Sequence, residues 1–256
     1  MANKYFDIIV KSLMKHMGRL INISKIEQIL KRVVDEDFAN QKMYKLIYYL
    51  KNRGYLYNVK KNVFLVKRPE TELTQQHILD MFYRPIVKQH CNEFLKSNRY
   101  IGWLKALELN VSSFTIPDEL LIVNNYKQSN EIIMFMKQIC FKRYGTAKEN
   151  LFSFFYKFVK KITIGKNVFF VADLELALLE SLYNPGLINT GYVTELVKRT
   201  IRERKDDLDL TVREKILRKN KHHSSINRLY KIAQSVDPVF ADRIKALIKK
   251  VSYFII

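Results

Sequence analysis

Apolar residues recur every three or four positions through the first 50 residues, which is the spacing of amphipathic helices. They fall into three groups, and each group predicts the buried face of one helix. The three faces are Phe6, Ile9, Val10, Leu13, Met14 and Met17; Ile26, Ile29, Leu30 and Val33; and Met43, Leu46, Ile47 and Leu50. Gly18 and Gly54 are well placed to end the first and third helices.

Polar residues predict where the second and third helices begin. Ser24 and Glu27 have the spacing of a capping box, in which the serine accepts from a backbone N–H and the glutamate bonds back. The acidic run 35–37 cannot stay on a buried face and predicts a turn. Asn40 is a good N-cap residue, so we expect the third helix to start near it.

The hydrophobic period then changes to that of strands. Residues 55–59 and 63–66 are rich in β-branched and aromatic side chains, and Lys60, Lys61 and Asn62 separate them, which predicts a β-hairpin. Three short helices followed by a hairpin is the order of a winged helix-turn-helix. We therefore expect a DNA-binding domain of this kind over residues 1–68.

In such a domain the third helix enters the major groove. At about 100° per residue, Gln41, Lys45, Tyr48 and Asn52 point away from its buried face. Amide side chains can bond an adenine edge, and lysine can reach guanine or phosphate. The predicted DNA-binding residues are Asn40, Gln41, Lys42, Tyr44, Lys45, Tyr48, Lys51, Asn52, Lys60 and Lys61. The alternatives are a solvated helix face and a module that binds protein.

The segment 67–72 is polar, contains a proline and follows the hairpin, so it predicts a domain boundary. A second, α+β domain is expected over 73–256, with a mixed pattern at 75–94 and a turn entering a short helix at 100–107. Three short apolar runs predict the strands of a small mixed sheet. These runs are 120–124, 138–144 and 167–172, and Asp173 is placed to cap the helix after the last one.

From about residue 190 the pattern is helical throughout, which predicts an all-helical, basic C-terminal part. Asp237 and Pro238 form a helix start, with a capping aspartate before a proline at the first helical position. The polar faces of these helices predict a second basic surface, with a set of solvated faces as the alternative. Its residues are Lys198, Arg199, Arg202, Arg204, Lys205, Arg213, Arg218, Lys219 and Arg228.

The charge distribution supports a polyanionic partner. The chain of 256 residues carries a formal net charge of +20. Residues 1–70 have 15 basic against 6 acidic side chains, 71–190 have 14 against 11, and 191–256 have 16 against 8. Two basic lobes therefore flank a nearly neutral middle, whereas a lysine excess from codon bias alone would spread evenly. Double-stranded DNA is the partner that fits best.

Sites of chemistry are sparse in the sequence. It has no phosphate-binding glycine loop, nucleophile elbow or metal-binding spacing of Cys and His, so we expect no enzyme, cofactor or metal. His222 and His223 are interpreted as a solvated helix start. Two carboxylate pairs, Asp118 with Glu119 and Asp173 with Glu175, leave a metal-dependent nuclease as an alternative. No run of 18 apolar residues occurs, and the first residues lack the basic-then-apolar layout of a signal peptide, so we expect a cytoplasmic protein without a transmembrane helix.

Several short motifs resemble the AbiEi-type antitoxins and related transcriptional regulators. The matching residues are Tyr100, Ile101, Ala106 and Leu107, and then Val171, Glu175, Ala177, Leu178, Leu179 and Pro185. Asn62 stands where the family's wing has glycine, and Glu180 stands where it usually has aspartate. The resemblance covers most of the chain, although its motifs are short and largely apolar.

The resemblance implies a repressor that binds its own promoter and counteracts a nucleotidyltransferase-like toxin, without direct contact being required. Composition and residue spacing by themselves predict DNA binding but not the antitoxin role. We therefore expect a sequence-specific, DNA-binding transcriptional regulator of unknown oligomeric state, and an antitoxin if the resemblance holds. The alternatives are a nuclease or other nucleic-acid enzyme, and a basic interaction protein of a mobile element.

Overall fold

The computed structural model describes residues 2–33, 36–95, 99–125, 131–143, 151–183, 190–219 and 222–255. Within these ranges, the side chains of residues 2–4, 36–42, 93–94 and 190 are not described. The chain divides into two compact units. The first comprises residues 1–83 and 132–138, and the second comprises residues 84–131 and 139–256.

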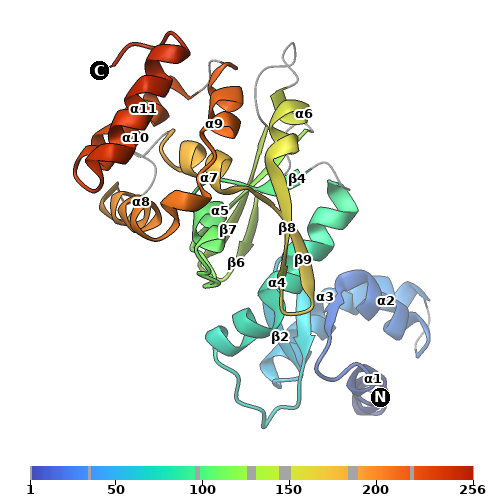
Figure 1. Cartoon of the computed structure of the whole chain (residues 1–256). Coiled ribbons are helices and arrows are strands. Elements are labelled where there is room, and N and C mark those ends of the chain that lie inside the picture. Colours follow the sequence, from blue (N-terminus) through green and yellow to red (C-terminus); the bar gives the residue numbers. More distant parts are fainter. Residues whose placement is uncertain are drawn as a thin grey trace. The chain divides into compact units, whose positions relative to one another are not determined.

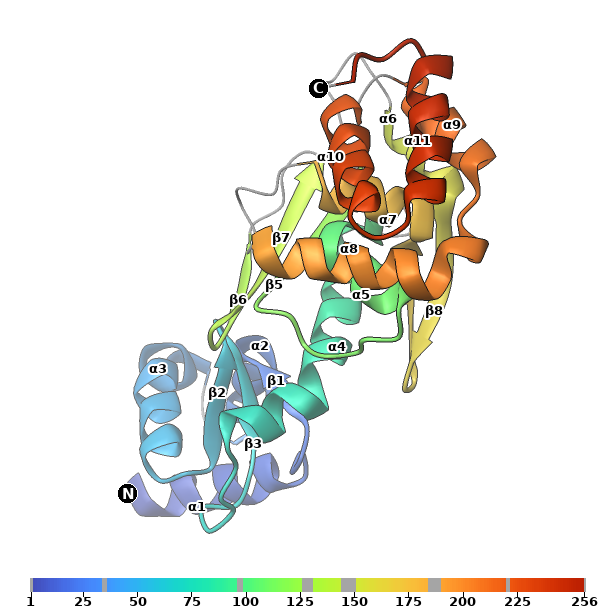
Figure 2. The same cartoon turned by 60° about the vertical axis from the view of Figure 1, so that its left-hand side comes forward.

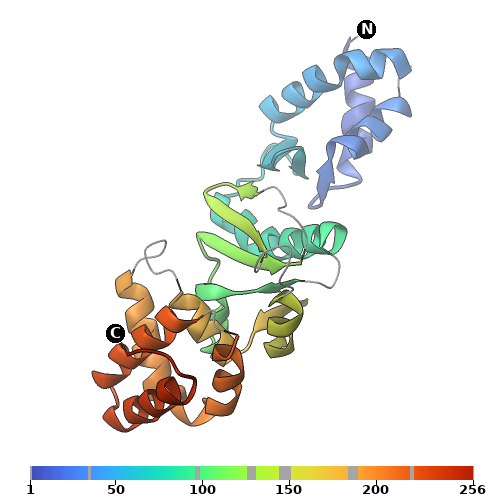
Figure 3. The same cartoon turned by 90° about the horizontal axis from the view of Figure 1, so that it is seen from above.

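The part of the first unit up to residue 66 consists of helices and a small antiparallel sheet (Figure 1). Its elements are α1 (Ala2–Met14), β1 (Leu20–Asn22), α2 (Ile23–Lys31), α3 (Glu36–Asn52), β2 (Leu56–Lys60) and β3 (Val63–Val66). The strand order is β1-β3-β2. Seen from above in Figure 3, the blue helices form one group at the N-terminal end.

The predicted hydrophobic faces meet in the core of this unit. Leu13, Ile26, Leu50 and Val66 are among its most completely buried side chains, and each comes from a different helix or strand. The predicted hairpin is confirmed, with β2 and β3 pairing antiparallel. Asn62 has a φ of +63° at the hairpin turn, a conformation that asparagine adopts more readily than most residues.

Two predicted helix starts were wrong. The N-cap of α2 is Asn22, whose Oδ1 accepts from the backbone N–H of Lys25 at 2.9 Å, so the helix begins before Ser24. The helix α3 begins at Glu36, and the acidic residues predicted to form a turn therefore lie partly in its first turn, where carboxylates interact well with the helix dipole. Residue 35 lies outside the described residues.

The remaining elements build a larger sheet and its covering helices (Figures 1 and 2). The strands are β4 (Arg99–Ile101), β5 (Glu119–Asn124), β6 (Ile132–Met134), β7 (Lys137–Arg143), β8 (Val159–Ile164) and β9 (Asn167–Ala172), in the order β6-β7-β5-β4-β9-β8. Most pairs with a described register are antiparallel, but β4 and β9 are parallel, so the sheet is mixed as predicted.

The other regular elements after residue 66 are helices. They are α4 (Gln75–Phe94), α5 (Trp103–Asn110), α6 (Leu151–Phe155), α7 (Leu174–Ser181), α8 (Thr190–Arg204), α9 (Leu210–Leu217), α10 (His223–Gln234) and α11 (Pro238–Lys250), with short 3₁₀ turns at Tyr156–Phe158 and Lys205–Asp207. Figure 2 shows α10 beside α11, next to α7 and α8, which confirms the helical C-terminal part. The fold is thus a mixed α+β fold.

The three predicted strands of this sheet are confirmed as β5, β7 and β9, and Asp173 and Asp237 are the predicted caps. The mixed pattern at 75–94 is one helix that contains Pro85. Tyr100 and Ile101, predicted as part of a turn, belong to the strand β4, which pairs with β5 and β9. Local periodicity could not reveal that pairing.

Candidate nucleic-acid interface

The outward face of α3 carries most of the predicted DNA-binding residues. Tyr44, Lys45, Tyr48, Lys51 and Asn52 are all exposed, as the helical spacing predicted. Asn40, Gln41 and Lys42 belong to the backbone of the helix, but their side chains lie outside the described part of the structure. The geometry therefore brings five of the eight predicted residues of this helix to one solvent-facing surface.

The two hairpin lysines differ from each other. Lys61 is exposed at the turn between β2 and β3, whereas Lys60 is only half-exposed and takes part in interactions of its own. Lys61 is therefore the better candidate for a contact to a phosphate.

After the two acidic residues at the start of α3, Glu36 and Asp37, a long segment follows that has no carboxylate. From Phe38 to Pro69 the chain contains no aspartate or glutamate, and it contains eight basic residues. These are Lys42, Lys45, Lys51, Arg53, Lys60, Lys61, Lys67 and Arg68. This segment forms the later part of α3 and the hairpin, and its net positive charge favours a polyanion.

The C-terminal set of predicted basic residues is different, because most of its members are paired. The pairs are Lys198–Glu195, Arg199–Glu203, Arg204–Asp207, Lys205–Asp237 and Arg218–Glu214. Lys219 lies 5.0 Å from the ring centroid of Phe154, and Arg202 is exposed. Neighbouring carboxylates thus compensate much of the positive charge that the sequence pattern placed here.

Two residues predicted for this second surface are not on it. Arg213 is fully buried, and its Nε donates to Oε2 of Glu175 at 2.7 Å. Arg228 is half-buried, and its Nη1 donates to the backbone oxygens of Leu182 and Tyr183 at 2.6 and 3.0 Å. Both predictions were wrong because helical spacing shows which face a residue occupies but not which faces a later helix covers.

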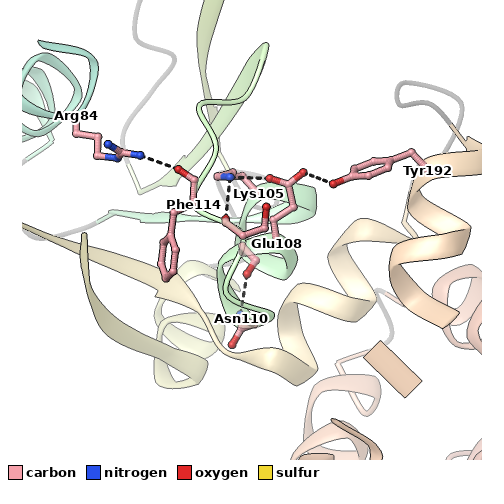
Figure 4. A network of polar contacts seen from close by, with 8 residues as sticks. Arg84, Lys105, Glu108, Asn110, Phe114 and Tyr192 are labelled. Atoms are coloured by element: carbon pink, nitrogen blue, oxygen red, sulfur yellow. Dashed lines mark hydrogen bonds and ion pairs between the residues drawn. The ribbon is translucent and has the colours of Figure 1, made fainter. Parts of the chain in front are cut away.

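A pocket of about 460 Å³ lies in the second unit, lined by residues of α5, β5, β7 and α8 and by the loop 115–117. Its polar wall is shown in Figure 4. Lys105 Nζ donates to Glu108 Oε2 at 2.6 Å and to the backbone oxygen of Ser113 at 3.2 Å. The hydroxyl of Tyr192 donates to the other oxygen of Glu108 at 2.8 Å, which links α8 to α5.

Burial shapes the electrostatics of this wall. It lowers the pKa of the Lys105 ammonium, and the carboxylate of Glu108 acts in the opposite direction. Burial and the bond to Glu108 raise the pKa of Tyr192 to about 12, so its hydroxyl stays protonated and donates at neutral pH. The sequence motifs did not single out this network, although the i, i+3 spacing of Lys105 and Glu108 on one helix is a recognisable signal for an ion pair.

The two carboxylate pairs of the nuclease alternative have different surroundings. Asp118 and Glu119 are exposed and line the pocket. Asp173 caps α7, accepting from the N–H of Leu176 at 2.9 Å, and Glu175 binds the buried Arg213. Among the described residues, no three His, Cys, Asp or Glu side chains are grouped so as to hold a metal ion.

His222 is fully buried, so its interpretation as solvated was wrong. Its ring packs edge-on against the rings of Phe155 and Tyr183, both at 5.7 Å between centroids. Burial lowers its pKa to about 4, and the ring is neutral at physiological pH. His223 is half-exposed at the start of α10.

The described motif residues from Tyr100 to Glu180 lie in the second unit, whereas Asn62 lies in the first unit and Pro185 lies outside the described residues. Tyr100, at the first motif, donates its hydroxyl hydrogen to Glu180 Oε1 at 2.7 Å. The other oxygen of Glu180 accepts from the backbone N–H of Trp103 at 3.0 Å. A Cβ at Gly102 would lie 2.6 Å from that carboxylate, so the close approach requires glycine. The helices α5 and α7 pack directly on each other around this contact.

No protein-family model matches the chain, and no curated protein matches it. Among solved structures, the chain is similar to the RV2827C protein from Mycobacterium tuberculosis, with a TM-score of 0.56 and 11% sequence identity. The similarity covers 95% of this chain and 81% of that chain. At this identity the likeness concerns the fold alone. No helix in the described ranges is both long and apolar enough to cross a membrane.

Proposed function

We propose that this protein is a sequence-specific, double-stranded DNA-binding transcriptional regulator whose N-terminal unit is a winged helix-turn-helix. The order helix, strand, helix, helix, strand, strand supports the proposal, with α3 as the recognition helix and the β2–β3 hairpin as the wing. The antiparallel order β1-β3-β2 ties the hairpin to the strand that precedes α2.

The observation that carries the proposal is the carboxylate-free basic segment from Phe38 to Pro69. It supplies exposed lysines along α3 and at the hairpin turn, while the C-terminal basic residues are largely paired with carboxylates. DNA binding gains most of its salt-dependent affinity from unpaired cations that replace counterions at phosphates. The first unit therefore has the more suitable charge for DNA.

The finer role that we propose is that of an autoregulating, antitoxin-like repressor. The support is the AbiEi-type resemblance, whose motif residues Tyr100 and Glu180 bond each other in the second unit. In that role the protein would repress its own promoter and counteract a nucleotidyltransferase-like toxin without a required direct contact.

A gel-shift experiment with the duplex upstream of its own gene tests the DNA-binding proposal. We expect saturable binding that falls steeply with salt, with the logarithm of affinity losing roughly 0.9 per contacted phosphate for each tenfold rise in salt. The double variant Lys45→Ala/Lys61→Ala should bind more weakly and reduce that slope by up to about 2.

The matched control is Lys166→Ala/Lys249→Ala, which removes the same charge from two exposed lysines of the second unit. Long-range attraction depends on net charge and would weaken binding equally in the two double variants. Only a local interface at Lys45 and Lys61 would make their affinities differ. Binding that never saturates, or equal losses in both variants, would count against the proposed interface.

A further inference from the structure

The recognition surface of α3 has an unusual composition for a solvated helix face. Three tyrosines are exposed on it, with 70% of Tyr44, 59% of Tyr48 and 46% of Tyr49 accessible. Tyrosine is a weaker helix former than alanine, lysine or glutamate, so helix formation does not explain this choice. Clustered exposed aromatic side chains mark contact surfaces more often than solvated ones.

The tyrosines are arranged around the basic residue at the centre of the face. The rings of Tyr48 and Tyr49 pack edge-on with centroids 6.0 Å apart, and Lys45 Nζ lies 6.0 Å from the ring centroid of Tyr49. Tyr44 and Tyr48 are one helical turn apart and follow each other along the helix. The face thus combines the two successive rings of Tyr44 and Tyr48 with Lys45. Asn52 lies on the same face, one turn after Tyr48.

Guanine contacts in the major groove come most often from arginine or lysine. The helix α3 contains no arginine, so lysine is the guanine partner that it offers, and lysine also binds phosphate. The next arginine along the chain, Arg53, lies with its guanidinium carbon 4.4 Å from the ring centroid of Phe6, on α1. Asn52, in contrast, has the side chain that pairs with an adenine edge, and aromatic rings make apolar contact with the thymine methyl group.

We infer that α3 reads A·T base pairs, through contact of the Tyr44 and Tyr48 rings with thymine methyl groups and of the Asn52 amide with adenine. This inference rests on the proposed DNA binding and specifies its target. The basic segment from Phe38 to Pro69 has a charge opposite to that of duplex DNA, and the tyrosines supply the sequence preference that lysines alone do not give.

The test begins with selection of binding sites for the full chain from a random duplex library, which should yield A·T base pairs at the centre of each site. Each thymine of the selected duplex is then replaced by deoxyuridine, which removes only the methyl group. Burial of one such carbon is worth about 0.8 kcal/mol, so each contacted methyl group should contribute about fourfold in affinity.

Tyrosine variants connect the methyl groups to the helix. The double variant Tyr44→Ala/Tyr48→Ala should bind the thymine duplex more weakly than the native chain does. Replacing thymine by deoxyuridine should then change the affinity of the variant by less than about twofold, because the rings that contact the methyl groups are gone and a double-mutant cycle detects this coupling. Tyr5→Ala, an exposed tyrosine on α1, is the matched control and should retain the full deoxyuridine effect. Circular dichroism checks that each variant is folded.

The outcomes separate the two proposals. Selected sites rich in G·C, or equal affinity for thymine and deoxyuridine duplexes, would overturn the inference while DNA binding stands. A failure of the full chain to enrich any duplex would overturn the proposed function and the inference together.

Discussion

At the residue scale, two fully buried titratable groups of the second unit have pKa values shifted in opposite directions. Burial raises the pKa of Glu180 to about 7, against the hydrogen bonds from Trp103 and Tyr100, which favour the charged carboxylate. Burial lowers the pKa of His222 to about 4. Glu180 therefore keeps its neutral form up to a pH of about 7, and His222 keeps its neutral form down to a pH of about 4.

These shifts predict two opposed contributions to stability. Glu180 stabilises the fold fully below its unfolded pKa of 4.5, and this contribution is lost as the pH rises to about 7. His222 stabilises it above its unfolded pKa of 6.5, and that contribution is lost as the pH falls to about 4. Between pH 4.5 and 6.5 the two therefore offset each other in the native protein.

Single variants should expose each contribution in the free energy of unfolding, measured by urea denaturation across this pH range. Relative to the native chain, Glu180→Gln should gain about 2 kcal/mol between pH 4.5 and 6.5, and His222→Gln should lose a similar amount. The double variant serves as the control and should again be nearly flat relative to the native chain. Parallel pH profiles for all four proteins would contradict the shifts.

At the element scale, two residues are candidates for the N-cap of α2, Ser24 from the sequence pattern and Asn22 from the structure. Ser24 and Glu27 have the spacing of a capping box, but the side chain of Asn22 makes the capping hydrogen bond. The helix begins earlier because Leu20–Asn22 pairs with β3, and the chain turns into the helix directly from that strand. A strand of three residues leaves no periodic signal in the sequence.

Alanine substitutions distinguish the two starts by thermal or chemical denaturation. Asn22→Ala should destabilise the first unit by about 1 kcal/mol, because an N-cap side chain is lost. Ser24→Ala, in the first turn and exposed, should change stability by less than about 0.5 kcal/mol. If Ser24→Ala lost more stability than Asn22→Ala, the capping box of Ser24 and Glu27 would be the correct interpretation.

The elements that could be predicted from the sequence are those with a strong local signal. The three N-terminal helical faces, the hairpin, and the helices capped by Asp173 and Asp237 follow from period and capping chemistry. Long-range partners could not be predicted. Tyr100 and Glu180 are 80 residues apart, and Arg213 meets Glu175 across 38 residues, so neither local period nor charge indicated these contacts.

The candidate site also has a part that could be predicted from the sequence and a part that could not. Exposure of the α3 residues followed from helical geometry, since the buried positions of a helix define the opposite face. The pairing of the C-terminal cations depended on side-chain positions and on contacts such as Lys205 with Asp237, 32 residues apart. The polar faces inferred from helical spacing therefore overstated the second surface.

At the scale of the whole molecule, the first unit is not continuous in sequence. It includes residues 132–138 as well as 1–83, and the ring of Phe135 lies 6.2 Å from that of Tyr57 on β2. The polar segment 67–72 predicted that the first domain ends at residue 68, before α4. A boundary signal in the sequence indicates a polar connection, but it cannot indicate that a later segment joins the earlier unit.

We therefore expect the fragment 1–68 to be less stable than the same residues in the full chain. Amide hydrogen exchange of α3 and β3, measured in the fragment and in the full chain, reports the difference directly. Faster exchange in the fragment is the expected result, because Ile132–Gln138 and the first part of α4 are missing. Equal protection in both proteins would show that residues 1–68 are self-sufficient.

The discontinuity of the first unit also sets the order in which the protein can mature on the ribosome. Residues 1–83 emerge first, but the unit is complete only when residue 138 has been synthesised, 55 residues later. At roughly 5–20 residues per second, translation takes about 3 to 11 s to cover that interval. During this time α3 has been synthesised while its own unit is still incomplete, so a pause in translation before residue 138 would prolong the incomplete state.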